Sequence, residues 1–63
     1  MIANEQALYS AFRALREKVT ALRRLAARYD NMPELQRYYD VLATDAERSA
    51  DSIRTLLDGS KEA

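Results

Sequence analysis

Apolar side chains in the first half of the chain recur at alternating steps of four and three residues. The series consists of Leu8, Phe12, Leu15, Val19, Leu22, Ala26 and Tyr29. This heptad spacing places all seven side chains on one face of a helix. The pattern therefore predicts an amphipathic helix over about residues 4–29, with Asn4 as its cap.

The second half of the chain repeats the same alternation. Its series consists of Leu35, Tyr39, Leu42, Ala46, Ser49, Ile53 and Leu56. We expect a second helix over about residues 33–58, with a stripe as long as the first. Gly59 is a typical stop signal, so residues 59–63 are expected to form a tail.

The segment Asp30-Asn31-Met32-Pro33 lies between the two stripes and predicts a turn over residues 30–32. Proline suits the first turn of a helix and pushes the residue before it out of helical geometry. Asn31 is an alternative cap, with Glu34 reaching back to it. The expected fold is all-α: one domain over residues 1–63, folded as an antiparallel two-helix hairpin. In this register Lys18 lies opposite Asp45.

A chain of 63 residues buries a small share of its surface unless a disulfide, a metal or a second subunit helps. The sequence contains no Cys and no His, so association is the remaining means of stabilisation. We therefore expect a homodimer that forms a four-helix bundle. The layout of two equal helices joined by a short turn resembles that of the RNA-binding hairpin family of Rop, whose dimers have this architecture. The resemblance is one of architecture alone, and no site residue is carried over from that family.

A second stripe on the first helix gives candidates for self-association. Its members are Ala7, Ala11, Ala14, Ala21 and Leu25, with Lys18 among them. Small residues allow close helix approach, and a two-fold dimer would bring Ala7 of one copy near Leu25 of the other. The alternative is that surface alanines merely favour helix formation.

The composition leaves few routes to catalysis. Without His, Cys or a Gly-rich loop, the serines have no base to activate them, and we expect no enzyme, no cofactor and no metal site. Glu47 and Asp51 lie one turn apart, but a solvated charged face is the favoured interpretation. No apolar run is long enough for a signal peptide or membrane span, and the lack of Cys fits a cytoplasmic location.

The charges balance overall but are divided between the helices. Residues 1–29 contain six basic and two acidic residues, a net charge of +4, whereas residues 30–63 contain four basic and eight acidic residues, a net charge of −4. Four cations, Arg13, Arg16, Arg23 and Arg24, fall on the outward side of the first helix. They either pair with the acidic second helix, which we favour, or bind an anion such as nucleic acid.

Three tyrosines gather near the turn. Tyr29 and Tyr39 are expected to close the end of the hairpin, whereas Tyr38, with Leu25 and Val41, lies off the main stripe and is a candidate contact for a protein partner. The expected function is that of a non-enzymatic adaptor or regulatory protein that binds itself and another protein. The alternative is a small nucleic-acid-binding regulator that uses the basic face of the first helix.

Overall fold

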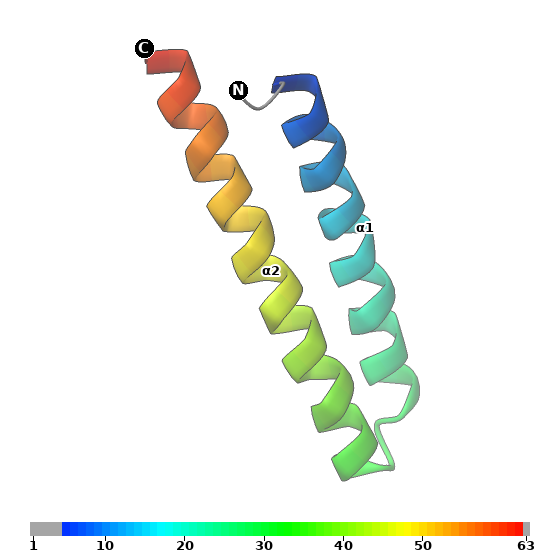
Figure 1. Ribbon diagram of the computed structural model, residues 1–63. Helices are drawn as coiled ribbons and strands as arrows, with labels where there is room; N and C mark the ends of the chain where they lie inside the picture. The colour runs from blue at the N-terminus through cyan, green and yellow to red at the C-terminus, as the bar shows by residue number, and fades with distance from the viewer. Residues whose placement is uncertain (1–4, 63) are drawn as a thin grey trace.

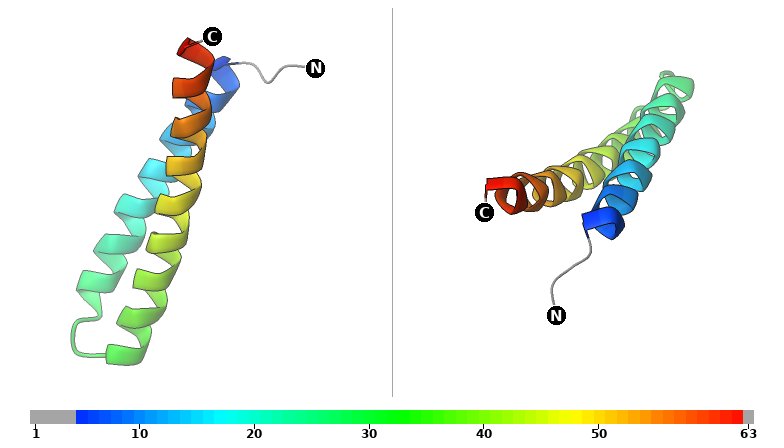
Figure 2. Two further views of the ribbon diagram at one scale, coloured as in Figure 1. Left: turned by 90° about the vertical axis from the view of Figure 1, so that its left-hand side faces the viewer. Right: turned by 90° about the horizontal axis from the view of Figure 1, so that it is seen from above.

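The chain folds as two antiparallel helices joined by a short turn (Figure 1). The computed structural model describes the backbone of residues 5–62 and the side chains of residues 5–59. Helix α1 spans Glu5–Arg28 and helix α2 spans Pro33–Glu62. Figure 2 shows that the helices lie side by side along their length in a single layer. The expected cap Asn4 lies outside the described residues.

The turn ends α1 and starts α2 through backbone hydrogen bonds. The amide of Tyr29 donates to the carbonyls of Leu25 and Ala26 at 3.2 Å, and the amide of Met32 donates to the carbonyl of Tyr29 at 2.9 Å. The amide of Gln36 then donates to the carbonyl of Met32 at 2.9 Å, which makes Met32 the residue that precedes the first turn of α2. Pro33 follows it at the first helical position, where its missing amide hydrogen costs nothing.

Helix α2 continues beyond the end expected from the sequence. The pattern placed the helix end near residue 58, but α2 runs through Gly59 to Glu62. None of the described glycines has a positive φ angle, so Gly59 does not form a left-handed cap. A glycine costs a helix only about 1 kcal/mol relative to alanine, which is too little to end the helix by itself.

The stripe predicted on the first helix forms the α1 side of the interface between the helices. Val19, Leu22 and Ala26 are buried, and the other four members are half-buried. These four residues are Leu8, Phe12, Leu15 and Tyr29. The periodicity of α1 therefore identified the face that packs on α2.

The stripe predicted on the second helix is correct at only some of its positions. Ala46 is buried and Leu35, Tyr39, Leu42 and Ile53 are half-buried, as expected, but Ser49 and Leu56 are exposed. Ala50 and Leu57, one residue after each of these, are buried instead, and Ala43 is buried beside the half-buried Leu42. Ser49 therefore does not lie in the interface, and Leu56, 60% exposed, lies outside it.

Small side chains explain this rotation of α2. Ala43 and Ala50 are fully buried and Ala46 is nearly so. An alanine leaves room for the larger Val19 and Leu22 of α1, so the two helices approach closely and their side chains make more dispersion contacts. The larger Leu42 is then only half-buried, and Leu56 is exposed on an adjoining face of the hairpin.

Candidate functional site

The hairpin has two broad sides, one on each flank of the interface between the helices. The residues on these two sides differ in chemistry. One side contains Arg23, Asp40 and Glu47 and is polar. The other side contains the second stripe of α1 and the residues that α2 displaces from the interface. We call this second side the apolar face; its members are Ala7, Ala11, Ala14, Ala21, Leu25, Tyr38, Leu42 and Leu56.

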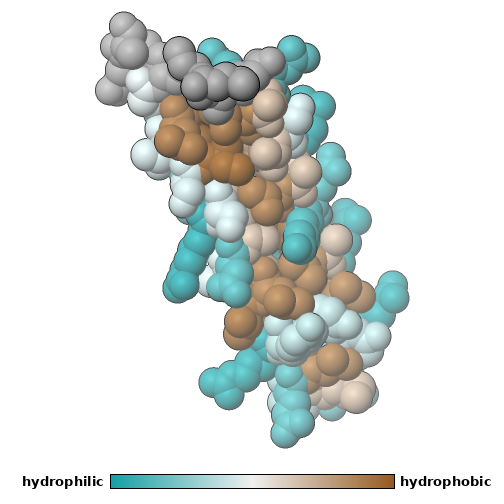
Figure 3. All heavy atoms as spheres, viewed as in Figure 1, coloured by the Kyte–Doolittle hydropathy of each residue, from teal (hydrophilic) through white to brown (hydrophobic). Residues whose placement is uncertain are grey.

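The apolar face is accessible to solvent over both helices. Its alanines are exposed, Leu25 and Leu42 are half-buried, and Tyr38 and Leu56 rank among the most exposed large apolar residues described. Figure 3 shows apolar side chains running over the hairpin from the end that carries the termini to the turn, with polar side chains between them. Lys18 and Asp45 cross this face near its middle and are exposed.

The exposed area of the hairpin is large for its mass. A compact monomer of 7.2 kDa is expected to expose about 4,100 Å². This chain exposes 5165 Å². The excess is roughly 1,000 Å², which follows from the single-layer shape, because neither helix is covered on its outer side.

An ion-pair bridge between the helices forms the polar side. The guanidinium of Arg23 donates to Oε1 of Glu47 at 2.6 Å and to Oδ1 of Asp40 at 3.3 Å. Asp40 and Glu47 lie one turn to either side of Ala43, so the small alanine lets the arginine reach both carboxylates. The hydrogen bond to Glu47 raises the pKa of Arg23 further above its usual value, which keeps the charge fixed.

The bridge separates Arg23 from the other cations of the predicted anion site. Arg13, Arg16 and Arg24 are exposed and make no ion pair within the described residues. The structure therefore leaves three cations available to an anion, whereas Arg23 already has two carboxylate partners.

Aromatic stacking closes the turn end of the hairpin. The rings of Tyr29 and Tyr39 stack with centroids 5.7 Å apart and planes at 16°, and the ring of Tyr38 meets that of Tyr39 edge-on at 5.4 Å and 68°. The side-chain amide of Gln36 donates to the carbonyl of Ala26 at 3.2 Å and ties the two helices together nearby.

The predicted partner-contact residues lie at the turn half of the hairpin. Tyr38 is 57% and Val41 53% exposed, whereas Leu25 is half-buried. A shallow depression beside them is lined by Met32, Pro33, Glu34, Leu35 and Tyr38. The heptad spacing predicts that Tyr38 lies outside the interface. It does not predict the exposure of Leu56 at the other end, because Leu56 continues the predicted stripe of the second helix.

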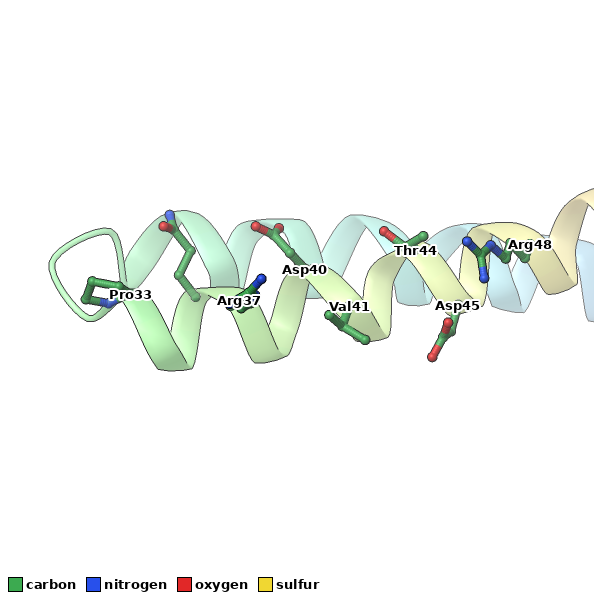
Figure 4. Close-up of a pocket in the computed structure, with 8 residues that line it drawn as sticks. Pro33, Arg37, Asp40, Val41, Thr44, Asp45 and Arg48 are labelled. Carbon is green, nitrogen blue, oxygen red and sulfur yellow. The ribbon is translucent and has the colours of Figure 1, made fainter.

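The outer side of α2 forms an open depression along its described residues. It is lined by residues of α2 alone, among them Arg37, Thr44 and Arg48. In Figure 4 the labelled side chains of Asp40 and Thr44 point to one side of the helix and those of Val41 and Asp45 to the other. Their polar groups therefore do not converge on a common centre.

Neither a metal site nor a similar protein assigns a function to the described residues. Among the described residues, no three acidic side chains gather where they could hold a metal ion, and no described helix is long and apolar enough to cross a membrane. Glu47, which lies one turn from Asp51, is bound by Arg23. No protein-family model, curated protein or solved structure matches the chain.

Proposed function

We propose that this chain is a non-enzymatic interaction protein that works as a homodimer. In this proposal two hairpins pack through their apolar faces into a four-helix bundle, and the outer helix surfaces are presented to a protein partner. The observation that carries the proposal is the apolar face itself, because an uncovered band of Leu, Tyr and Ala side chains over both helices is typical of a surface that another protein covers.

The exposed area supports a second copy as the covering partner. Stable interfaces bury about 800 Å² on each side, and the hairpin exposes roughly 1,000 Å² more than a compact chain of its mass. Covering the apolar face of each copy with that of the other also gives each helix two neighbours, which is the arrangement of a four-helix bundle.

The nucleic-acid alternative receives less support. A phosphate would have to compete with Asp40 and Glu47 for Arg23, and the net charge of α2 is negative. Contact with a protein partner through Leu25, Tyr38 and Val41 stays a prediction that competes with the dimer, because Leu25 and Tyr38 belong to the apolar face. The cytoplasmic location also stays a prediction.

A matched pair of substitutions tests the dimer. Leu56→Glu places a charge on the apolar face, at a side chain that is already 60% exposed within one hairpin, and Thr55→Glu places the same charge on the neighbouring outer position. Sedimentation equilibrium is expected to show a weakened dimer for Leu56→Glu and an unchanged dimer for Thr55→Glu. Equal behaviour of both variants, or a monomeric wild-type chain, would remove the proposal.

A further inference from the structure

Two copies that meet through their apolar faces have two symmetric arrangements open to them. If the two-fold axis runs along the bundle, both turns lie at the same end and α1 of each copy packs on α2 of the other. If the axis runs across the bundle, the turns lie at opposite ends, α1 packs on α1, and α2 packs on α2. The self-packing expected for the alanine stripe, with Ala7 of one copy near Leu25 of the other, belongs to the opposite-end arrangement, whereas the same-end arrangement sets this stripe against α2 of the other copy.

The charges of the two helices differ between these arrangements. Residues 1–29, which include α1, have a net charge of +4, and residues 30–63, which include α2, have a net charge of −4. The same-end arrangement sets a basic helix against an acidic one at both contacts. The opposite-end arrangement sets basic against basic and acidic against acidic.

The charged residues in and beside the apolar face sharpen this difference. Lys18 and Asp45 lie at similar heights along the hairpin, and neither has an ion-pair partner in the described residues. With both turns at one end, Lys18 of each copy reaches Asp45 of the other. With the turns at opposite ends, Lys18 lies near Lys18 of the other copy, because both occupy the middle of α1.

Residues at the margin of the apolar face follow the same pattern. In the same-end arrangement Arg28 falls beside Glu34 of the other copy. Both side chains are exposed and make no ion pair within the described part of the hairpin. Two pairs of opposite charge, Lys18 with Asp45 and Arg28 with Glu34, therefore become available at each of the two symmetric contacts.

We infer that two copies of this chain associate with both turns at the same end, so that α1 of each copy packs against α2 of the other. This inference rests on the proposed function, because it specifies how the proposed dimer is built. It also brings the exposed Met32 and Tyr38 of both copies to one end of the bundle.

Distances between spin labels at the turn distinguish the two arrangements. The chain contains no Cys, so Asn31→Cys gives one labelling site per copy at an exposed turn position. Same-end association is expected to give a label separation of roughly 15–25 Å, set by helix spacings of ~10 Å. Opposite-end association would give about 36 Å or more, since α1 has 24 residues and the hairpin is 48 Å long.

A label at a second position provides a control for these distance measurements. Thr20→Cys lies near the middle of α1, where both arrangements predict similar separations. A short turn-to-turn distance supports the inference. A long distance in a dimer overturns the inference but leaves the proposed function intact, whereas a monomeric labelled chain with normal helical circular dichroism overturns both.

Removal of the central charge gives an independent test. Lys18→Ala is expected to weaken the same-end dimer about threefold to twentyfold, because symmetry removes two ion pairs at once. Lys18→Arg should retain the affinity, and Arg13→Ala, on the outer side of α1, should leave it unchanged. A tighter dimer for Lys18→Ala would overturn the inference, because that is the result expected when two lysines face each other.

Discussion

The buried alanines of α2 make one substitution decisive for the packing of the hairpin. Ala50 is fully buried against α1, whereas its neighbour Ser49 is exposed. Ala50→Leu adds three carbon atoms where the helices approach closely, so the helices must separate or the side chain must leave its preferred rotamer. Overpacking of this kind costs about 1–3 kcal/mol for each copy.

Urea denaturation followed by far-ultraviolet circular dichroism measures this cost. With a dependence of about 1 kcal/mol per molar urea for so small a chain, Ala50→Leu should lower the unfolding midpoint by about 1 M or more. Ser49→Leu, compared at the same protein concentration, should not lower it. A stable Ala50→Leu variant together with a destabilised Ser49→Leu variant would refute the packing, because Ser49 would then face α1.

Other substitutions test the remaining contacts. Leu57→Ala should lower the free energy of unfolding by about 2 kcal/mol, since Leu57 is 4% exposed, and an unchanged urea midpoint would place it outside the core. Arg23→Gln should lower the thermal midpoint by less than Leu57→Ala does, with an effect that shrinks as salt is added, whereas Arg16→Gln should leave the midpoint unchanged. The chain should not retard RNA in a low-salt gel-shift assay; retardation that Arg13→Ala and Arg16→Ala together abolish would favour the nucleic-acid alternative.

The hairpin itself could be predicted from the sequence because its signals agree with one another. Two heptad stripes of equal length flank a single segment that contains Pro33, and α2 begins at that residue. The stripe of α1 is unambiguous, since the competing alternation through Ala14 and Ala21 has smaller side chains and is interrupted by Lys18. The side of α1 that faces α2 followed directly.

The heptad pattern does not determine which face of α2 packs on α1. Tyr39, Ala46 and Ile53 fit two alternations, one through Leu42 and the other through Ala43. Hydrophobicity favours the leucine, but close packing against the larger side chains of α1 favours the alanine. This competition depends on the distance between the helices, which a single sequence does not specify.

The sequence predicts some members of the apolar face and misses others. The alanine stripe of α1 and the position of Tyr38 off the interface were visible from the spacing. The contribution of Leu42 and Leu56 depends on the rotation of α2, and so it was missed. The charge difference between the helices indicated that they pair, but only the geometry assigns Arg23 to Asp40 and Glu47.

The mass of the folded chain in solution tests the central claim most directly. Light scattering across micromolar concentrations, with circular dichroism recorded on the same samples, should give twice the chain mass of 7.2 kDa together with high helix content. A fully helical chain that remains at 7.2 kDa throughout would contradict the claim, because the apolar face would then be stable in water without a second copy.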